Sequence, residues 1–234
     1  MNTKVVKFER PPATSPFRSD PASKTPAHQH VYERLREMIL FGNLAPGQAV
    51  TIQGLTARLS TGMTPVREAL RRLIAEDALT HQDNRRVSVP VLTPHCIGEL
   101  GYMRGALEPE LARRAAQYIT SARLDELRGM DAALNNAIAN GDVSGYLTHN
   151  YQFHSAIYDS AEAPIMAATV DRLWLRFGPS LRVVCRRFGT SDLPDKHVEL
   201  LTALAEGDAD GAAQAMAEDV DQGTKQVRAA ILDG

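Results

Sequence analysis

The segment TPVREALRR, residues 64–72, constrains the fold of this chain more than any other stretch. Thr64 is a favoured helix N-cap residue, and Pro65 suits the first helical turn, where its missing N–H would have no intrahelical partner. Apolar side chains recur at helical spacing through the segment and beyond it, which predicts an amphipathic helix. Arg67 and Arg71 lie on the other face of this helix, so they are available to a ligand.

A shorter helix is predicted just before this one, over residues 52–59, with a turn at residues 61–63 between the two. Two helices joined by such a turn form a helix-turn-helix motif, whose second helix enters the major groove of DNA. Another helix, at residues 30–41, supplies an apolar stripe against which the pair can pack. The sequence therefore predicts a DNA-binding unit in which the arginine-bearing helix faces the nucleic acid.

Two short strands, at residues 79–82 and 86–91, are predicted directly after this motif. Asp83, Asn84 and Arg85 are expected to make the turn between them. A hairpin in this place is a wing, and its arginines, which include Arg86, are expected to lie against the DNA backbone or in the minor groove. The alternative for all the arginines named so far is a solvated surface without a ligand.

Charge is distributed unevenly along the 234 residues, although the net charge is only −2. Residues 1–90 hold 13 Lys and Arg against 8 Asp and Glu, whereas residues 91–234 hold 13 against 20. A basic part joined to an acidic part suits a polyanion-binding unit on a body that binds something else, with chance asymmetry as the alternative. The proline-rich residues 1–27 predict a disordered, mildly basic tail.

The composition also bears on location. No apolar run approaches the length of a membrane span, and the N-terminal residues contain no apolar signal segment. The two cysteines, Cys96 and Cys185, match no metal-ligand spacing and suggest no disulfide framework. The expected location is therefore the cytoplasm, with no membrane partner.

The segment 30–91 resembles the winged helix-turn-helix of GntR-family transcription regulators. The resemblance rests on the runs GNLAPGQAV and TPVREALRRLIAEDALTHQDNRRVSV. It implies a DNA-binding domain over residues 28–91, in which Arg67 corresponds to a DNA-contacting arginine of the third helix. It also matches Thr64 to a small hydroxyl residue that the family has at the start of that helix.

Three positions differ from the family pattern. This chain has Met63 and Gln53 where the family often has an arginine, so base contacts there must differ and the operator sequence cannot be transferred. Asn84 occupies the wing tip, where glycine is usual, and asparagine can adopt the same left-handed conformation. The expected DNA-contacting residues are Gln53, Thr64, Arg67, Arg71, Asn84, Arg85 and Arg86.

Helical periodicity continues from Thr93 almost to the end of the chain. It predicts six helices, at residues 94–119, 121–140, 142–160, 164–188, 193–206 and 208–232. With no strand signal in this part, the helices are expected to form an antiparallel bundle. The predicted fold is therefore mainly α: a winged helix-turn-helix with a small β-hairpin, followed by a bundle of about six helices.

Polar residues interrupt the apolar stripes of several of these helices. Asn150 and His154 are four apart and stack on one inward face, His197 shares a face with two leucines, and Asp219 lies beside an apolar stripe. Because buried polar groups are costly without partners, these side chains are expected to surround a divalent cation such as zinc, nickel or manganese. The alternatives are hydrogen-bonded core histidines and a pairing of Asp219 with an arginine.

The order of these features resembles the FCD effector-binding domain that one branch of GntR regulators carries. The resemblance covers about residues 97–232 and rests on YMRGALEPELARRAA, NYQFHSAIY and KHVELLTALAEGDADGAAQAM. It implies a metal held by Asn150, His154 and His197. Asp219 takes the fourth position, where the family has a further histidine.

The same resemblance implies an effector pocket with Arg104 in its lining. An i,i+4 pair with Glu108 is the alternative for this arginine. Trp174 and Phe177 are interpreted as core or dimer packing rather than pocket lining, and His149 as a surface residue. The pocket is expected to take a small organic or sugar acid, whose carboxylate would complete the coordination of the metal.

These features predict a homodimeric, ligand-responsive transcription regulator and not an enzyme. Residues 92–234 would form the effector-binding and dimerisation domain, and two winged units would read the half-sites of a pseudo-palindromic DNA operator. One alternative is a metal-dependent hydrolase, but the chain has no His-Glu-x-x-His motif and no nucleophile with a base at a readable spacing. The other is a DNA-binding protein that responds to no effector, which the inward polar cluster argues against.

Overall fold

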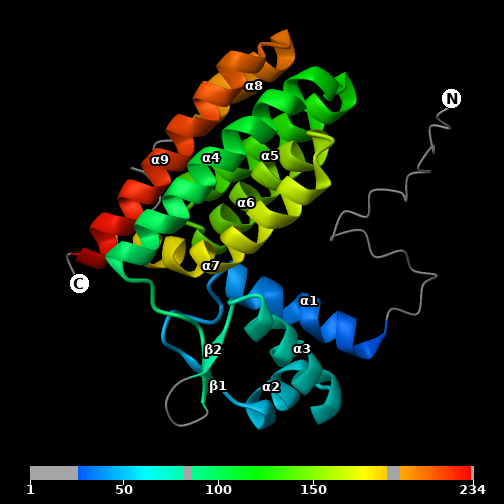
Figure 1. The fold of residues 1–234 in the computed structure, drawn as a ribbon, viewed down its shortest axis with the longest axis vertical. Coiled ribbons are helices and arrows are strands. Elements are labelled where there is room, and N and C mark those ends of the chain that lie inside the picture. The colour runs from blue at the N-terminus through cyan, green and yellow to red at the C-terminus, as the bar shows by residue number, and fades with distance from the viewer. Residues whose placement is uncertain (1–25, 82–85, 189–195, 233–234) are drawn as a thin grey trace, which may run out of the picture.

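The computed structural model describes residues 26–81, 86–188 and 196–232, and divides them into a small head and a larger helical body (Figure 1). The head contains α1 (Ala27–Leu40), β1 (Ala49–Val50), α2 (Ile52–Leu59), α3 (Met63–Ala75), β2 (Thr80–His81) and β3 (Val87–Ser88). The body contains α4 (Pro94–Tyr118), α5 (Ser121–Ala139), α6 (Val143–Ser160), α7 (Pro164–Phe188), α8 (His197–Glu206) and α9 (Ala209–Leu232). The predicted fold class is thereby confirmed. The predicted disordered tail falls almost entirely outside the described residues.

The helix-turn-helix forms as predicted, with one correction at its second helix. α2 begins where the Thr51 hydroxyl accepts the Gly54 N–H at 3.0 Å, and it ends at Ser60, which has a left-handed backbone with φ of 48°. α3 begins at Met63, because the extended backbone of Gly62 allows the next residue to enter the helix. The prediction that Thr64 caps α3 is therefore wrong. Thr64 lies inside the first turn and is exposed.

The wing is part of a three-stranded antiparallel sheet with the order β1-β3-β2. β2 and β3 are shorter than the predicted strands. β1 was not predicted, because two residues are too few to produce an alternating pattern. Val50 pairs with Val87 and His81 pairs with the same residue from the other side, so β3 is the central strand. The predicted turn at residues 83–85 lies outside the described residues.

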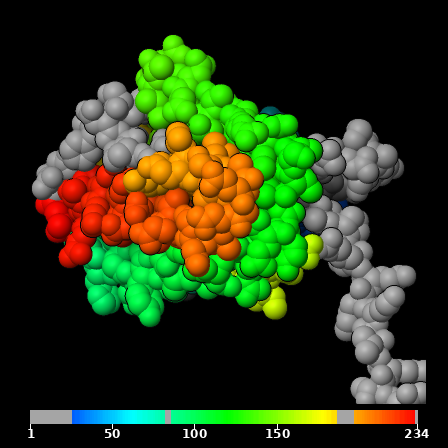
Figure 2. Space-filling model, turned by 90° about the horizontal axis from the view of Figure 1, so that it is seen from above, coloured from blue at the N-terminus to red at the C-terminus, as the bar shows by residue number. Residues whose placement is uncertain are grey.

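The helices of the body pack around one apolar core that continues into the head. α4 lies along α9, α5 along α6, and α8 against α9. Figure 2 looks onto the end of the body farthest from the head, where α8 in orange lies over the bundle beside α9 in red. Thr93, Thr120 and Asp142 cap α4, α5 and α6 by accepting a backbone N–H from the first turn of each helix, which explains why these starts were predictable. In the described ranges, no helix combines the length and apolar character that crossing a membrane requires.

The head contacts the body mainly through α1, which packs against α7 (Figure 1). Gly178 of α7 permits the close approach, because a Cβ atom there would lie 2.6 Å from the backbone oxygen of Leu40. Nearby, the guanidinium of Arg182 donates to the backbone oxygen of Phe41 at 3.4 Å. The end of α1 therefore rests directly on the helix that also lines the interior of the body.

Candidate functional sites

The exposed face of α3 carries the arginines that the sequence singled out. Arg67 and Arg71 are both exposed, whereas Val66 and Leu70 on the opposite face are buried. Arg71 forms an ion pair with Glu68 at 2.8 Å on the surface. Among the described residues, no ion-pair partner is found for Arg67, so its guanidinium is free to meet a phosphate or a base edge.

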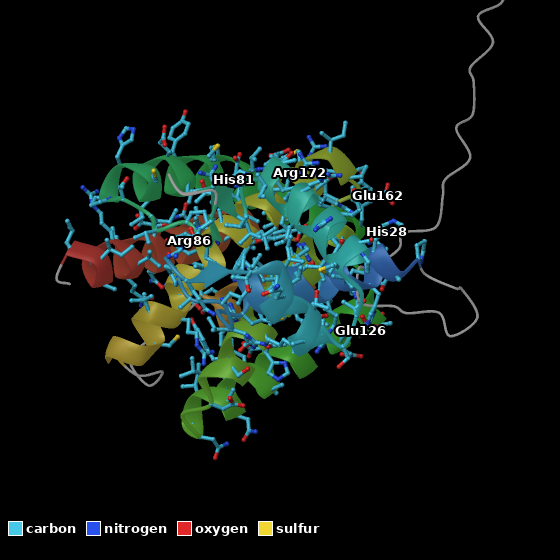
Figure 3. All side chains as sticks on the ribbon, turned by 90° about the horizontal axis from the view of Figure 1, so that it is seen from below. His28, His81, Arg86, Glu126, Glu162 and Arg172 are labelled. Atoms are coloured by element: carbon cyan, nitrogen blue, oxygen red, sulfur yellow. The ribbon has the colours of Figure 1, made fainter. Side chains whose placement is uncertain are left out.

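The other predicted DNA-contacting residues of the head differ in how far the structure describes them. Gln53 and Thr64 are exposed in the first turns of α2 and α3. Arg86 is exposed directly before β3, close to the sheet residue His81 (Figure 3). Asn84 and Arg85 lie outside the described residues. The surfaces of α2, α3 and the sheet thus carry the exposed residues of the predicted set.

Arg72, which follows Arg71 on α3, has a different environment. Its guanidinium lies 3.6 Å from the ring centroid of Tyr32 on α1, and its Nε donates to Glu76 at 3.0 Å. The Tyr32 hydroxyl donates to the same carboxylate at 2.7 Å, and burial together with this carboxylate raises the pKa of Tyr32 to about 12. Arg72 therefore ties α3 to α1 and stabilises the head.

The body brings three of the four predicted metal ligands together from three different helices. His154 of α6, His197 of α8 and Asp219 of α9 each offer a ligand atom, and these atoms lie within 4.8 Å of one another. His154 Nε2 lies 3.2 Å from Asp219 Oδ2, and both imidazoles are buried. Asn150, one turn before His154, is 9% exposed and lines the same cavity as Asp219.

The electrostatics of this cluster suit a cation. Burial alone would raise the pKa of Asp219, but the hydrogen bond from His154 and the attraction of both imidazoles lower it to about 2. Asp219 is therefore an anion at neutral pH and needs no deprotonation to act as a ligand. Two imidazole nitrogens with a carboxylate and an amide oxygen form a donor set that zinc, nickel or manganese accepts. The ligand atoms, which lie within 4.8 Å of one another, would move closer together around such an ion.

Asp131 of α5 supports this cluster and was not predicted. Its Oδ1 lies 3.1 Å from His197 Nδ1, and the ring of Phe153 stacks on His197 at 4.0 Å. A carboxylate at Nδ1 favours the tautomer with its proton there, which turns the lone pair of Nε2 toward the cluster. A signal was present in the sequence, since Asp131 interrupts the apolar stripe of Leu127 and Leu134.

A small cavity of about 30 Å³ lies beside the cluster. Arg104, Asn150, Trp174, Phe177 and Asp219 are among its lining residues. Trp174 and Phe177 are buried in the core, as interpreted, but both also form the wall of this cavity, so the expectation that they do not line a pocket is wrong. The volume holds about one water molecule or an ion, so a larger ligand must displace part of the wall.

Arg104 forms the i,i+4 pair with Glu108 and also lines the cavity. Its Nε donates to Glu108 Oε1 at 2.5 Å, and its guanidinium lies between the rings of Trp174 and Phe177, at 4.5 and 4.3 Å. The Tyr158 hydroxyl donates to the other oxygen of Glu108 at 2.6 Å. Burial alone would lower the pKa of Arg104, but the Glu108 carboxylate raises it, so the buried guanidinium stays charged. It is thus held facing the cavity as a fixed cation.

Comparison with protein families defines the class of this protein. Residues 27–89 match the family model described as bacterial regulatory proteins, gntR family, and residues 99–222 match the FCD domain. The chain therefore belongs to the GntR family of transcriptional regulators and carries an FCD domain. Its relatives and both domains are regulators, so the metal-dependent hydrolase is excluded and the prediction that the chain is not an enzyme is confirmed.

Individual relatives are similar along most of their length. The transcriptional regulator McbR of Escherichia coli K12 is 30% identical over 80% of this chain and 86% of its own. The repressor RspR of the same organism is 24% identical over 87% and 90%. The solved structure of E. coli McbR/YncC superposes with a TM-score of 0.82 at 28% identity, covering 87% of this chain and 97% of that one.

Proposed function

We propose that this protein is a cytoplasmic, homodimeric regulator whose DNA binding responds to a small organic or sugar acid. Residues 28–91 would bind the operator, and residues 92–234 would hold the effector and the dimer contact. The observation that carries the proposal is the cluster of His154, His197 and Asp219, beside a cavity that Asp219 lines together with the charged Arg104. The galactonate operon transcriptional repressor of E. coli K12, 24% identical over 83% of this chain and 93% of its own, is named for a sugar acid.

The metal and the effector would act together in this cavity. Asn150, His154, His197 and Asp219 would hold a divalent ion, which offers a Lewis-acidic position to a carboxylate oxygen when it is bound. Arg104 would bind the same carboxylate by a charge-assisted hydrogen bond through Nη1, because its Nε and Nη2 both donate to Glu108, at 2.5 and 3.3 Å. The two cations explain why an organic acid is the favoured class of ligand.

A thermal-shift screen of organic and sugar acids, with and without chelator, tests this proposal. A ligand that binds only the folded protein raises its stability by mass action, by about 2.7 kcal/mol at one hundred times its Kd. We expect a carboxylate to raise the melting temperature, and the chelator to remove the effect. Metal analysis of the purified protein accompanies the screen. A protein that binds neither zinc, nickel nor manganese contradicts the metal part of the proposal.

Replacing Arg67 with alanine is expected to weaken operator binding by about 1–3 kcal/mol, because one good base or phosphate contact is lost. Fold and dimer should be retained, since the side chain is exposed and is not held within the head. The measurement is a gel-shift titration at fixed salt. Arg34→Ala is the matched control: it removes an equally charged, exposed residue from α1, and it should change affinity far less. Equal losses in the two variants would refute a specific contact by Arg67.

The dimer contact is proposed at an open hollow of about 810 Å³ between α4, α7 and α9. Tyr102 is 80% exposed there, and Met103 is also exposed. Gly98 and Gly105 lie one turn before and after Tyr102 on the same face of α4, and a Cβ atom at either would meet nothing within 4 Å. One surface thus carries both a projecting ring and space to receive one, as a symmetric contact between two copies requires.

Charge on the same surface supports this contact. The hollow is lined by Arg176 and Arg228 together with Glu99. Arg176 Nε is buried and has no hydrogen-bond partner among the described residues, and neither arginine has an ion-pair partner there. A second copy related by symmetry would bring its own Glu99 toward these arginines. α4 follows directly on the sheet of the head, so a contact at its start would hold the two heads near each other.

Tyr102→Glu is therefore expected to weaken the dimer by at least about 2 kcal/mol, as replacement of an interface hot spot does. Sedimentation equilibrium of the full chain measures this. Tyr118→Glu is the matched control, since it places the same charge on a 52% exposed tyrosine near the other end of α4. A wild-type monomer, or a Tyr102→Glu protein that dimerises as well as the control, would refute this face as the dimer contact.

A further inference from the structure

A buried charged group joins the head to the body at one point. Arg36 of α1 is 7% exposed, and its guanidinium pairs with the Asp171 carboxylate of α7. The same guanidinium donates to the Tyr151 hydroxyl of α6 at 3.2 Å, and that hydroxyl donates to Asp171 Oδ1 at 2.5 Å. Three elements are thus connected by one closed set of hydrogen bonds.

The environment makes this contact sensitive to small displacements. Burial alone would lower the pKa of Arg36, but Tyr151 and Asp171 raise it, so the arginine stays charged in its buried position. Asp171 is 36% exposed, but the Arg36 side chain is only 9% exposed, so breaking the contact leaves the guanidinium without a counter-charge, which is more costly than breaking a surface pair. A displacement that separates Arg36 from these partners therefore has a large energetic cost.

Tyr151 also touches the wall of the cavity. Its ring lies edge-on to Trp174 with centroids 5.7 Å apart, and on its other side edge-on to Phe41 after α1, at 6.1 Å. Trp174 in turn lies 4.5 Å from the Arg104 guanidinium and 5.2 Å from the His154 ring. One aromatic residue therefore separates Tyr151 from both the proposed metal and the proposed effector contact.

We infer that Tyr151 transmits occupation of the cavity to the DNA-binding head through Arg36 and Asp171. The inference rests on the proposed function, because it assigns the regulation of that same cavity. A metal ion would draw together ligand atoms that lie within 4.8 Å of one another, among them an atom of His154, whose ring lies 5.2 Å from Trp174. An organic acid would in addition exceed a space of about 30 Å³. Either ligand therefore moves Trp174, the part of the wall that packs on Tyr151. Displacement of the Tyr151 hydroxyl changes the hydrogen bonds that fix α1, and with them the position of the head.

Zinc ion alone is the probe for the test, applied to the full chain. Trp174 is the single tryptophan of the sequence, so its fluorescence reports zinc binding at the cavity wall without a label. Hydrogen exchange of the α1 amides reports the state of the head. Tyr151→Phe removes only the hydroxyl and keeps both ring contacts. The matched control is Tyr32→Phe. It removes the hydrogen bond that the Tyr32 hydroxyl of α1 donates to Glu76 within the head.

In the wild type, zinc is expected to change α1 exchange by about fivefold or more, the lower end of usual allosteric couplings. Tyr151→Phe should bind zinc with similar affinity but lose the change in α1. Tyr32→Phe should keep the change. Retention of the full change in Tyr151→Phe, or zinc binding to the wild type without any change in α1, overturns the inference while leaving the metal site intact.

Absence of zinc binding would contradict only the proposed metal site. A second measurement, which needs no ligand, tests the inference in that event. The unfolding equilibrium is compared for Trp174→Phe, Arg36→Gln and the double variant. Independent residues give effects that multiply to within about twofold. We expect the effect of the double variant to differ from the product of the two single effects by about fivefold or more. This difference should become smaller when Tyr151→Phe is also present. Effects that multiply within twofold overturn the inference.

Discussion

Replacing Glu108 with alanine is expected to lower the free energy of unfolding by about 3–5 kcal/mol, the usual cost of breaking a buried ion pair. The Glu108 side chain is 0% exposed and accepts hydrogen bonds from Arg104 and from the Tyr158 hydroxyl. Its removal leaves a buried guanidinium without a counter-charge, in a protein whose total stability is of the order of 5–15 kcal/mol. Chemical denaturation followed by circular dichroism measures the loss.

The matched control is Glu110→Ala, two residues further along α4. Glu110 pairs with Arg114 at 2.8 Å on the surface, and such pairs contribute about 0–1 kcal/mol. Glu108→Gln separates the effect of charge from that of shape, because glutamine keeps the volume and one acceptor oxygen. Its loss of unfolding free energy should lie between those of Glu108→Ala and Glu110→Ala. If Glu108→Ala is no less stable than Glu110→Ala, the Arg104 charge is compensated by some other group and the description of the cavity is wrong.

The helices of the body could be predicted from the sequence because their starts carry their own signals. Thr93 followed by Pro94, and Asp142 after a glycine, are local features that fix a helix start whatever the rest of the chain does. The same reasoning gave the wrong cap for α3. There Gly62 is the cap residue, and Thr64, two residues later, offered a stronger but misleading signal.

The candidate site was partly predictable for a related reason. Asn150 and His154 lie four apart on one helix, so their common direction follows from helical geometry alone. The approach of His197 and Asp219 from two other helices followed from the family resemblance and the inward stripes. The pair of Arg104 with Glu108 was an alternative that the sequence offered. Neither source indicated that this pair is buried or that Tyr158 joins it, because a glutamate four residues after an arginine most often forms an exposed pair. Only the packing of α4 against α6 and α7 makes that pair the buried base of the cavity.

Trp174 illustrates what a sequence cannot resolve at all. An aromatic residue on an apolar stripe packs in the core in most proteins, and this one does so. Its second property, that it forms the wall between the cavity and Tyr151, depends on where α6 and α7 cross. The regulation proposed for the protein is therefore carried by contacts between helices whose individual sequences predict only burial.

The proposed metal site differs from that of the family at one ligand, Asp219, and this difference should have a large effect on metal preference. Asp219 replaces a neutral nitrogen ligand by an anionic oxygen, which should shift preference toward cations that accept oxygen, such as manganese or magnesium, with zinc still bound. Asp219→His is therefore expected to raise zinc affinity. It should lower manganese affinity at the same time, so the ratio of the two constants, measured by calorimetry, isolates the change of ligand type.

His154→Ala should abolish that binding, because it removes the central ligand of the buried cluster. Loss of a mere supporting residue at a metal site costs about 10–100-fold in affinity, and a direct ligand should exceed this. Non-specific DNA binding should persist, since the head is untouched, while any response to an organic acid is lost. His149→Ala is the matched control: His149 lies on the same helix, is half-buried, contacts Gln152 at 3.3 Å and does not belong to the cluster. If His154→Ala retains stoichiometric metal, His154 and His197 are hydrogen-bonded core residues and the metal is held elsewhere.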